Sequence, residues 1–383
     1  MPWIAAGLGT LAGGPARAQS FLDSRILFYK EPDGRTQVIN PVLFLQQDLG
    51  SRWGQLGVTL GYDAISGASP TGAYPTSDVT TSASGHLIRS GTFPSAEYRD
   101  ERKSAALSWG RKFGAHLPVI DFSYAKENDY LARSFGLSDS WTMAHGLGTL
   151  HYGVSFSRDV VSPVTTRVDH PKNENGYSLG WTQVLGERDV LDVSASLMQL
   201  SGYLTDPYKV VPIGDPAAGV TVPENRPDTR SRRAFFVKYA HAYTWNGALR
   251  ATYRYYDDSW GIRAHTLELA YGQRIEPGWI VTPEARLYTQ SRASFSGGSF
   301  PVAQEFMSAD YRLSAFGSVL GGLTISKDIT PALSALIAGT IQSQRGRDRV
   351  VPIPTSAEAE GGGSISAADM VIWTATAGFT LRF

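Results

Sequence analysis

Apolar and polar residues alternate along most of this chain. In the segment 53–63, Leu56, Val58 and Leu60 share one phase, and Gly57 and Thr59 share the other. The same two-residue period recurs at 120–124, 150–157, 191–197, 249–256 and 333–341, whereas helical periodicity is almost absent. Neighbouring side chains of a strand point to opposite faces of a sheet. The pattern therefore predicts an all-β protein with one apolar face and one wet face.

Sixteen segments with this period are predicted to be strands, at 25–29, 37–48, 53–64, 103–113, 117–126, 130–141, 149–158, 177–185, 190–201, 233–243, 249–257, 263–274, 279–291, 309–325, 332–342 and 370–383. The first, second and sixth are the least regular, and Pro41 interrupts the second. Fourteen and eighteen strands remain alternatives.

The connections between these segments fall into two classes. Seven are short, at 49–53, 113–117, 142–148, 185–189, 245–248, 276–278 and 327–331. Longer stretches rich in Gly, Pro, Ser or polar residues lie between them, at 66–102, 160–176, 202–231, 293–306 and 346–367. Short periplasmic turns that alternate with long external loops are typical of a transmembrane, antiparallel up-and-down β-barrel.

The last eight residues, TAGFTLRF, continue the alternation to the end of the chain. Ala377, Phe379, Leu381 and Phe383 share one face. A long terminal strand needs both of its edges paired or protected, and a closed barrel provides this by pairing the last strand with the first. The alternative is a buried C-terminal strand of a soluble sandwich.

The first 18 residues are predicted to be a signal peptide. An apolar stretch from Ile4 to Leu11 leads to Ala16-Arg17-Ala18, which resembles a signal-peptidase site. The basic region that normally opens such a peptide is missing, so we expect its start to be truncated. The expected organisation is a signal peptide at 1–18 followed by a single barrel domain at 19–383. An ordinary apolar N-terminal segment is the alternative.

The composition excludes several classes of protein. There are 35 Lys+Arg, 35 Asp+Glu and no cysteine, with a pI of about 7.1. The balanced charge argues against a nucleic-acid partner, and the lack of cysteine removes disulfides, thiolate catalysis and cysteine-ligated metals. A mean hydropathy of -0.17 and the absence of an 18-residue apolar run exclude a helical membrane bundle.

Charged residues occupy the polar phase of four consecutive predicted strands. An Arg or Lys facing lipid at mid-membrane costs about 2–4 kcal/mol, whereas a charge in a wet lumen is solvated. We therefore expect a lumen selectivity zone made of Lys238, Arg250, Arg254, Glu268, Glu284 and Arg286. Within it, Arg254, Glu268 and Glu284 are predicted to form a cross-strand ladder. The alternative is a salt-bridge network that only stiffens the wall or supports an inserted loop.

Four tryptophans, Trp53, Trp141, Trp245 and Trp279, fall at or beside predicted short turns. Indole rings prefer the membrane–water interface, so these residues are predicted to form an interfacial aromatic girdle at one rim. Aromatics that close the ends of a soluble barrel are the alternative.

Two of the long loops, 66–102 and 202–231, are long enough to fold inward and constrict the bore. Five prolines in the second loop predict a stiff segment that does not form a strand.

Signatures of enzymes and metal sites are missing from the sequence. It contains no phosphate-binding glycine loop, GxSxG, HExxH or EF-hand pattern. No catalytic residue, cofactor or metal site is predicted. His241 and His265 fall on the outward phase; His151 falls on the inward phase, with no partner visible in the sequence.

Two resemblances support this interpretation. TAGFTLRF resembles the C-terminal assembly signal of outer-membrane barrels, with Thr376, Gly378, Leu381 and Phe383 at its characteristic positions. Separately, NENGYSLGWTQVL, GYLTDPYK, RPDTRSRRAFFVKYAHA, YRYYDDSWGIRAHTLELAY and ARLYTQSRASF resemble an uncharacterised, porin-like outer-membrane family of Gram-negative bacteria catalogued as a domain of unknown function. The likeness covers about the C-terminal two-thirds. It implies a fold and a location, but no substrate.

The expected function is passive passage of small solutes through a charged lumen, because a barrel of about sixteen strands encloses an aqueous channel. One alternative is a scaffold or sheath for a lipoprotein, a secretion component or another envelope partner, and another is an enzyme carried on the surface loops. Expected partners are outer-membrane lipid, the barrel-assembly machinery and an envelope lipoprotein or periplasmic protein.

Overall fold

The structure is a computed structural model that describes residues 20–75, 80–81, 87–88, 93–353 and 364–383. The predicted signal peptide lies outside the described residues. Within them, no helix is long and apolar enough to cross a membrane.

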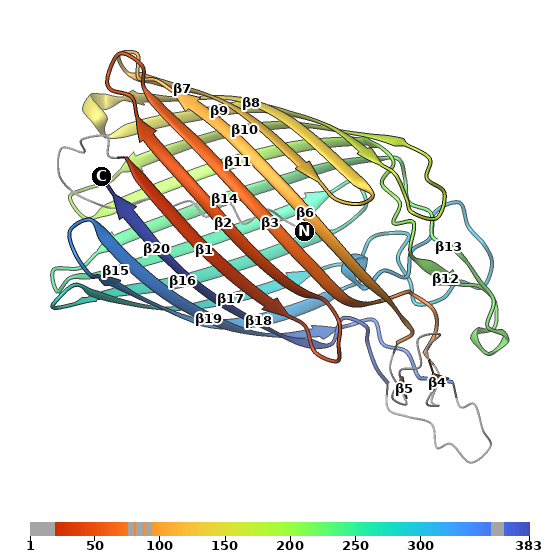
Figure 1. Cartoon of the computed structure of the whole chain (residues 1–383). Coiled ribbons are helices and arrows are strands. Elements are labelled where there is room, and N and C mark those ends of the chain that lie inside the picture. Colours follow the sequence, from red (N-terminus) through yellow and green to blue (C-terminus); the bar gives the residue numbers. More distant parts are fainter. Residues whose placement is uncertain (1–19, 76–79, 82–86, 89–92, 354–363) are drawn as a thin grey trace.

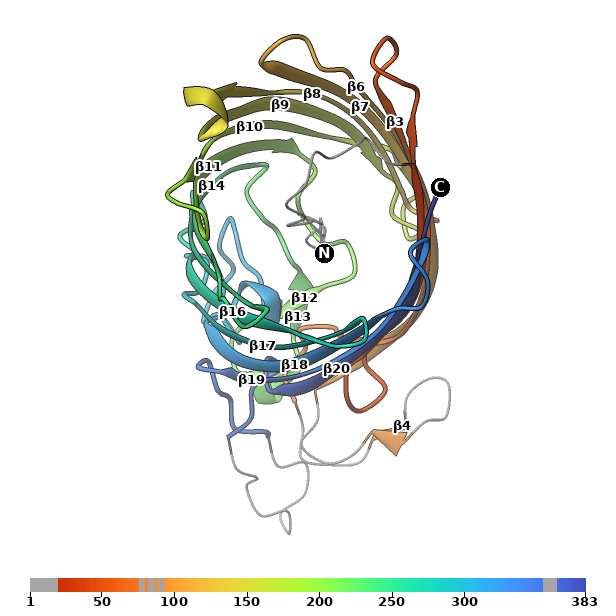
Figure 2. The ribbon, with the colours of Figure 1, turned by 90° about the vertical axis from the view of Figure 1, so that its left-hand side faces the viewer.

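Sixteen antiparallel strands of the described chain close into a single barrel (Figures 1 and 2). The wall strands are β1 (Phe21–Lys30), β2 (Gln37–Asp48), β3 (Gln55–Pro70), β6 (Ser95–Gly110), β7 (His116–Lys126), β8 (Tyr130–Met143), β9 (Gly148–Val161), β10 (His170–Val184), β11 (Asp189–Gly202), β14 (Thr229–Ala242), β15 (Gly247–Asp258), β16 (Arg263–Ile275), β17 (Trp279–Gln290), β18 (Phe316–Asp328), β19 (Leu333–Gly346) and β20 (Met370–Arg382). Each pairs with the next, which confirms the predicted fold and strand number.

The barrel closes between the last strand and the first. β20 pairs with β19 on one edge and with β1 on the other, where Leu381 lies opposite Leu22 and Phe379 opposite Ser24. A side chain at Gly378 would come within 2.7 Å of the Ser24 carbonyl oxygen, so the seam requires glycine there. The alternating C-terminus therefore has no free edge, and the soluble-sandwich alternative is wrong.

The outward face of the wall is apolar. Leu287 and Val319 are 51% and 57% exposed, and many other large apolar side chains of the same phase are exposed as well. Because successive residues alternate across a closed wall, the opposite phase, which includes Arg254 and Glu268, faces the lumen. An exposed apolar surface that surrounds a whole molecule calls for an apolar surrounding.

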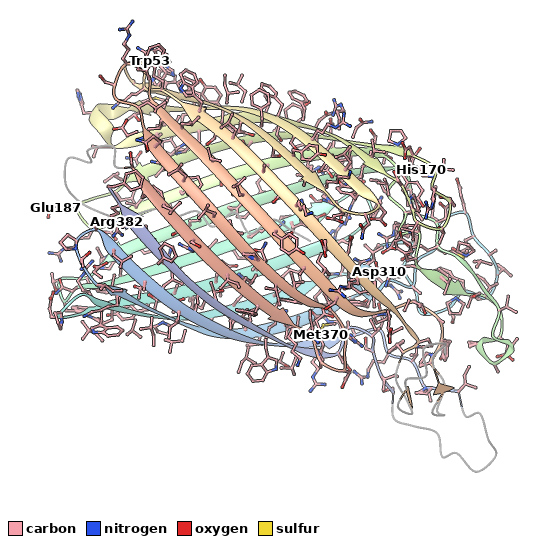
Figure 3. All side chains as sticks on the ribbon, in the orientation of Figure 1. Trp53, His170, Glu187, Asp310, Met370 and Arg382 are labelled. Atoms are coloured by element: carbon pink, nitrogen blue, oxygen red, sulfur yellow. The ribbon has the colours of Figure 1, made fainter. Side chains whose placement is uncertain are left out.

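The two ends of the barrel differ. All seven predicted short connections lie at one end, together with the C-terminus, and we call this end the short-turn rim; Trp53, Glu187 and Arg382 lie there (Figure 3). The other end, with His170 and Asp310, carries all the long connections, together with short ones such as 127–129 and 259–262, and we call it the long-loop rim (Figure 3).

The wall strands extend further toward the long-loop rim than the sequence predicts. The predicted loop 66–102 shrinks to 71–94, because β3 runs to Pro70 and β6 begins at Ser95. The predicted loop 160–176 similarly shrinks to 162–169. Beyond the apolar band both faces of a strand are wet, so the alternation that identifies a strand disappears although its hydrogen bonds continue.

Two predicted strand boundaries are corrected for other reasons. Pro41 does not interrupt the second strand: it lies within β2, and the side chain of the preceding Asn40 donates to the carbonyl of Tyr62 at 3.3 Å. The predicted strand 309–325 starts only at Phe316, because Asp310 caps a short 3₁₀ helix, η3 (Tyr311–Leu313), and holds that segment out of the wall.

Small secondary-structure elements lie within the connections between the wall strands. Two-stranded ribbons are formed by β4 (Thr80–Thr81) with β5 (Leu87–Ile88) and by β12 (Val210–Pro212) with β13 (Thr221–Pro223). The prediction that the proline-rich loop forms no strand is therefore wrong. Pro212 and Pro223 stand at the ends of the ribbon, where proline costs least. The other 3₁₀ turns are η1 (Ala144–Gly146) and η2 (Pro216–Ala218).

Candidate functional site in the lumen

The six charged residues predicted to line the lumen lie on the inward phase of β14 to β17. The register places Lys238 opposite Thr252, Thr252 opposite Glu268, and Glu268 opposite Arg286. The carboxylate of Glu268 and the guanidinium of Arg286 approach to 2.7 Å. Four neighbouring strands thus share one row of polar groups around the wall.

The predicted ladder of Arg254, Glu268 and Glu284 has a different arrangement. Glu268 pairs with Arg286 instead, and Arg254 lies opposite Thr266. Arg250 and Glu284 lie in a neighbouring row, on either side of Ala270.

Arg254 is held by aromatic rings rather than by a carboxylate. Its guanidinium lies 5.5 Å from the ring centroid of Phe236 and 5.1 Å from that of Tyr256, which is cation–π distance. Its Nε has no hydrogen-bond partner among the described residues. The positive charge of Arg254 is therefore not neutralised by a neighbouring side chain of the described wall.

A chain of side-chain contacts continues the row across β8 to β14. Ser140 Oγ lies 2.9 Å from His151 Nδ1, His151 Nε2 lies 3.1 Å from Thr182 Oγ1, and Thr182 donates to Asp192 at 2.8 Å. Asp192 then faces the ammonium of Lys238 at 3.7 Å. The sequence showed no partner for His151, and the structure supplies two.

The carboxylate of Asp192 sets the donor and acceptor roles in this series of side-chain contacts. An ionised Asp192 only accepts, so the Thr182 hydroxyl donates to it and must itself accept from His151 Nε2–H. The Ser140 hydroxyl lies within hydrogen-bond distance of Nδ1, the other ring nitrogen. With Thr252, Glu268 and Arg286, these residues form a polar belt around about half of the lumen: Ser140, His151, Thr182, Asp192, Lys238, Thr252, Glu268 and Arg286.

Replacing Asp192 by asparagine tests the belt. The change leaves Lys238 without its nearest carboxylate, so we expect ion selectivity to shift toward anions, measured as the reversal potential under a salt gradient. The matched control is Asp257→Asn, which removes the same charge from the outward face of β15, beside Arg233. An equal shift in the control would show that the effect does not come from the lumen.

The long connection 203–228 reaches across the mouth at the long-loop rim. It leaves the wall at β11, yet Lys209 Nζ donates to Ser69 Oγ at 2.7 Å and Val210 N donates to Thr71 O at 2.9 Å, at the end of β3. β3 is six strands from β11 in a ring of sixteen. The end-on view accordingly shows β12 and β13 within the outline of the wall (Figure 2).

A second connection, 291–315, is bound to the first. Met307 and Asn225 exchange two backbone hydrogen bonds of 2.8 and 3.0 Å. A small apolar core, made of Trp260, Ile262, Ala293, Phe295 and Leu313, lies at the base of these connections. The two connections are therefore packed structures that narrow the mouth of the barrel.

Four charged side chains join the two connections, and we call them the loop cluster: Glu224, Arg226, Asp310 and Arg312. The guanidinium of Arg226 contacts Glu224 at 2.6 Å and Asp310 at 2.8 Å. Arg312 Nε donates to Asp310 at 2.8 Å. The side chains of Glu224 and Asp310 are fully or almost fully buried.

Burial and charge act differently on the two carboxyl groups of the cluster. Burial alone would raise the pKa of Asp310, but the guanidinium groups of Arg312 and Arg226 outweigh it and hold the pKa well below its ordinary value. For Glu224, burial dominates and raises the pKa despite Arg226. The contact between Arg226 and Asp310 is therefore one ionised link between the two connections at neutral pH. Arg312 of the second connection forms another ion pair, with Asp206 of the first at 2.7 Å.

The predicted aromatic residues lie at the short-turn rim. Trp53, Trp141, Trp245 and Trp279 are all exposed there. Trp109, which was not among the predicted residues, lies beside them, and its indole donates to the Trp53 carbonyl at 2.8 Å. Its position at the end of β6, beside a short connection, was the available signal. The girdle role of these residues stays a prediction, as does the assembly role of Thr376, Gly378, Leu381 and Phe383.

The outward histidines have polar partners on the same face. His241 Nδ1 lies 2.7 Å from Asp189, and His116 Nδ1 lies 2.6 Å from Asp139, both near the short-turn rim. His265 Nδ1 lies 2.7 Å from the Tyr253 hydroxyl near the other rim. These pairs explain how polar rings are accommodated on an apolar wall.

One group of acidic side chains in the described chain brings possible metal ligands together. Oxygen atoms of Asp100, Glu127 and Asp129 lie within 4.8 Å of one another at the long-loop rim. Arg102 faces Glu127 at 3.5 Å, and the Tyr208 hydroxyl donates to Asp129. These contacts already compensate part of the negative charge, so the group alone does not indicate a metal site.

The sequence matches the family described as "Protein of unknown function (DUF3570)" over residues 12–339. The chain belongs to this family. The match confirms the resemblance drawn from the sequence and extends it, because DUF3570 also covers most of the first 100 residues. No curated protein matches the chain.

Solved structures with a similar fold are outer-membrane barrels. A bacterial polysaccharide outer-membrane secretin has a TM-score of 0.51 and 8% identity, over 94% of this DUF3570 chain and 98% of its own. The siderophore receptor PirA from Pseudomonas aeruginosa has a TM-score of 0.44 and 10% identity, and the match covers 96% of this chain and 81% of the receptor. OccK9 (OpdG) from Pseudomonas aeruginosa has a TM-score of 0.44 and 13% identity, and the match covers 95% of this chain and 98% of OccK9. At these identities the similarity concerns the fold alone.

Proposed function

We propose that this protein is a channel in the outer membrane of a Gram-negative bacterium and that it passes small solutes passively through its charged, water-filled lumen. A closed barrel with an apolar outer wall satisfies every backbone group of its strands in hydrocarbon. The short-turn rim then faces the periplasm and the long-loop rim faces outward, as in other barrels of this class.

The observation that carries the proposal is the solvent exposure of charges inside the wall. The side chains of Lys238, Arg286 and Glu268 are 54%, 45% and 42% exposed although they face the lumen. A barrel filled by its own side chains would bury them, as small barrels do. Charged groups that are exposed to the water of a passage act on passing ions through their field.

The crossing connections favour a second candidate, a scaffold or sheath for an envelope partner. Lys209 and Val210 tie one connection to the far wall, so the mouth is narrowed before any solute arrives. A lipoprotein or periplasmic partner entering from the short-turn rim would find the wider end. No residue arrangement described above favours a surface enzyme.

Conductance across a planar lipid bilayer tests the channel. We expect the purified, folded chain to give stable, ohmic openings, because a wet lumen of sixteen strands offers a continuous path for ions. A heat-sensitive shift in gel mobility checks folding in the same preparation. A folded but silent barrel would contradict the channel, and co-purification of one stoichiometric envelope partner would then support the scaffold.

A further inference from the structure

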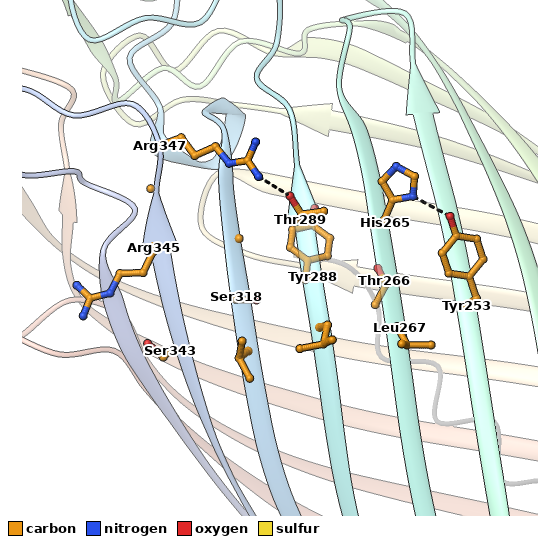
Figure 4. A pocket seen from close by; sticks show the side chains of 14 residues that line it. Tyr253, His265, Thr266, Leu267, Tyr288, Thr289, Ser318, Ser343, Arg345 and Arg347 are labelled. Carbon is orange, nitrogen blue, oxygen red and sulfur yellow. Dashed lines mark hydrogen bonds between the residues drawn. The ribbon is translucent and has the colours of Figure 1, made fainter.

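A shallow groove lies on the outward face of the wall near the long-loop rim, over β15 to β19 (Figure 4). Its volume is ≈ 600 Å³. Four strand spacings separate its two sides, which is about 19 Å. The register arranges the residues in two outward rows: first Tyr253, Leu267, Leu287, Val319 and Ser343, and then, nearer the rim, Tyr255, His265, Thr289, Gly317 and Arg345.

The hollow results from small residues placed among large ones. Gly317 has no side chain, and the side chains of Thr289 and Ser343 are short. Leu287 and Val319 beside them are larger and give the groove an apolar surface, which we call its apolar floor. The floor is continuous with the apolar outer wall. Any occupant therefore needs an apolar part that lies at membrane depth.

The edge of the groove nearer the rim is basic. Arg345 and Arg347 are both exposed. Arg347 Nη2 donates to Thr289 Oγ1 at 3.5 Å, and Arg345 has no side-chain hydrogen bond or ion pair within the described part of the chain (Figure 4).

The carboxylates near this edge already face other cations. Asp348 lies 3.8 Å from Arg292, and Asp257 lies 3.9 Å from Arg233. Two guanidinium groups thus stand beside an apolar floor without a carboxylate partner in the described chain.

We propose that this groove binds an anionic lipid of the external leaflet, one that carries phosphate groups and several acyl chains. The proposal rests on the membrane position proposed above, but not on conduction. Guanidinium groups bind phosphate oxygens through two parallel hydrogen bonds. Arg345 and Arg347 hold the phosphate groups, and the acyl chains lie along Leu267, Leu287 and Val319.

The order of the rows decides between this lipid and other occupants. Along the barrel axis the face changes from a mainly apolar row with Leu287 to the row that contains Thr289 and Arg345, and Arg347 follows nearer the rim. An anionic lipid has the same order of polarity from its acyl chains to its headgroup. A soluble anion would make no use of the apolar floor. A zwitterionic lipid would bring its own cation toward two arginines, at a cost in free energy.

Native mass spectrometry of the full chain in detergent tests the proposal. The probes are a bis-phosphorylated, multiply acylated glucosamine disaccharide, the same lipid without phosphate, and phosphatidylcholine. We expect one molecule of the phosphorylated lipid to be retained and the other two to be lost at the same activation energy. Equal retention of all three would overturn the proposal, as would displacement of the lipid by inorganic phosphate alone.

Paired variants locate the site. Arg345→Glu with Arg347→Glu is expected to reduce retention about tenfold or more, because two attractive charges become repulsive. Arg133→Glu with Arg158→Glu makes the same charge change at exposed positions on β8 and β9 and should leave retention unchanged. Equal loss in both pairs would overturn the proposal, and so would a dimer that Ser343→Trp disrupts, since a second copy would then cover the groove.

Conduction is measured separately on the same variants. Lipid retention without conductance would contradict the proposed channel and support the lipid-binding groove. Conductance without selective lipid retention would support the channel and contradict the groove. If the glutamate pair does not fold, the comparison of the three lipids on the unmodified chain still decides the proposal.

Discussion

Replacing Arg250 and Arg254 together by glutamate is expected to move the reversal potential of the channel strongly toward cation selectivity. The two substitutions change the lumen charge by four units on one strand, and neither arginine has a carboxylate partner among the described contacts. Arg254 is held by Phe236 and Tyr256, so its charge is available to passing ions. Fixed charges in a passage select ions through their field.

The control for this experiment is Arg233→Glu with Arg263→Glu. These arginines lie on β14 and β16, in the opposite phase to the lumen residues, and they are exposed on the outward face. The control changes the total charge of the barrel by the same amount without changing the lumen. An unchanged reversal potential in the Arg250 and Arg254 variant would remove both residues from the conducting path.

The second large effect is expected from Arg226→Met, which removes one of the two arginine charges that link the connections and keeps most of the side-chain volume. The ion pair between Arg312 and Asp206 remains. Glu224 and Asp310 would then remain buried without Arg226, and removing one partner from a buried ion pair costs about 3–5 kcal/mol. We expect the packing of the connection 203–228 against 291–315 to loosen, with larger conductance and faster proteolysis within 203–228.

The wall itself should survive this change, because no wall strand depends on Arg226. The gel mobility of the folded barrel is therefore expected to be unaltered. Arg233→Met serves as the matched control, since it removes the same charge from an exposed side chain whose nearest carboxylate is 3.9 Å away. Conductance that stays at the level of the unmodified protein, in spite of cleaved loops, would show that the crossing connections do not limit the passage.

These two experiments also separate the candidate functions. In a channel, the lumen charges control selectivity and the crossing connections control conductance, so the two variants should act on different quantities. A scaffold that does not conduct would show neither ion selectivity nor conductance, but Arg226→Met would still expose its connections to protease. The loop cluster is therefore a property of the fold, and the selectivity zone is a property of the channel alone.

The sequence by itself determined the class of fold and the two kinds of connection, and it favoured sixteen strands over fourteen or eighteen. This was possible because a membrane wall imposes a strict period of two on every strand, and each residue such as Leu287 or Arg286 reports its own side of the wall. The position of the C-terminal strand in a closed wall could also be predicted from the sequence. Its alternation through Phe383 already required a partner on each edge, and β1 provides the missing one.

Only the tertiary structure decided which residues meet. The partners of His151 come from β8 and β10, and their contact depends on the hydrogen-bond register between strands, which a period of two does not specify. The outward hollow around Gly317 depends on the same register across five strands. The crossing of 203–228 to β3 is a contact between residues about 140 positions apart, made where both faces of the chain are wet and the sequence carries no periodic signal.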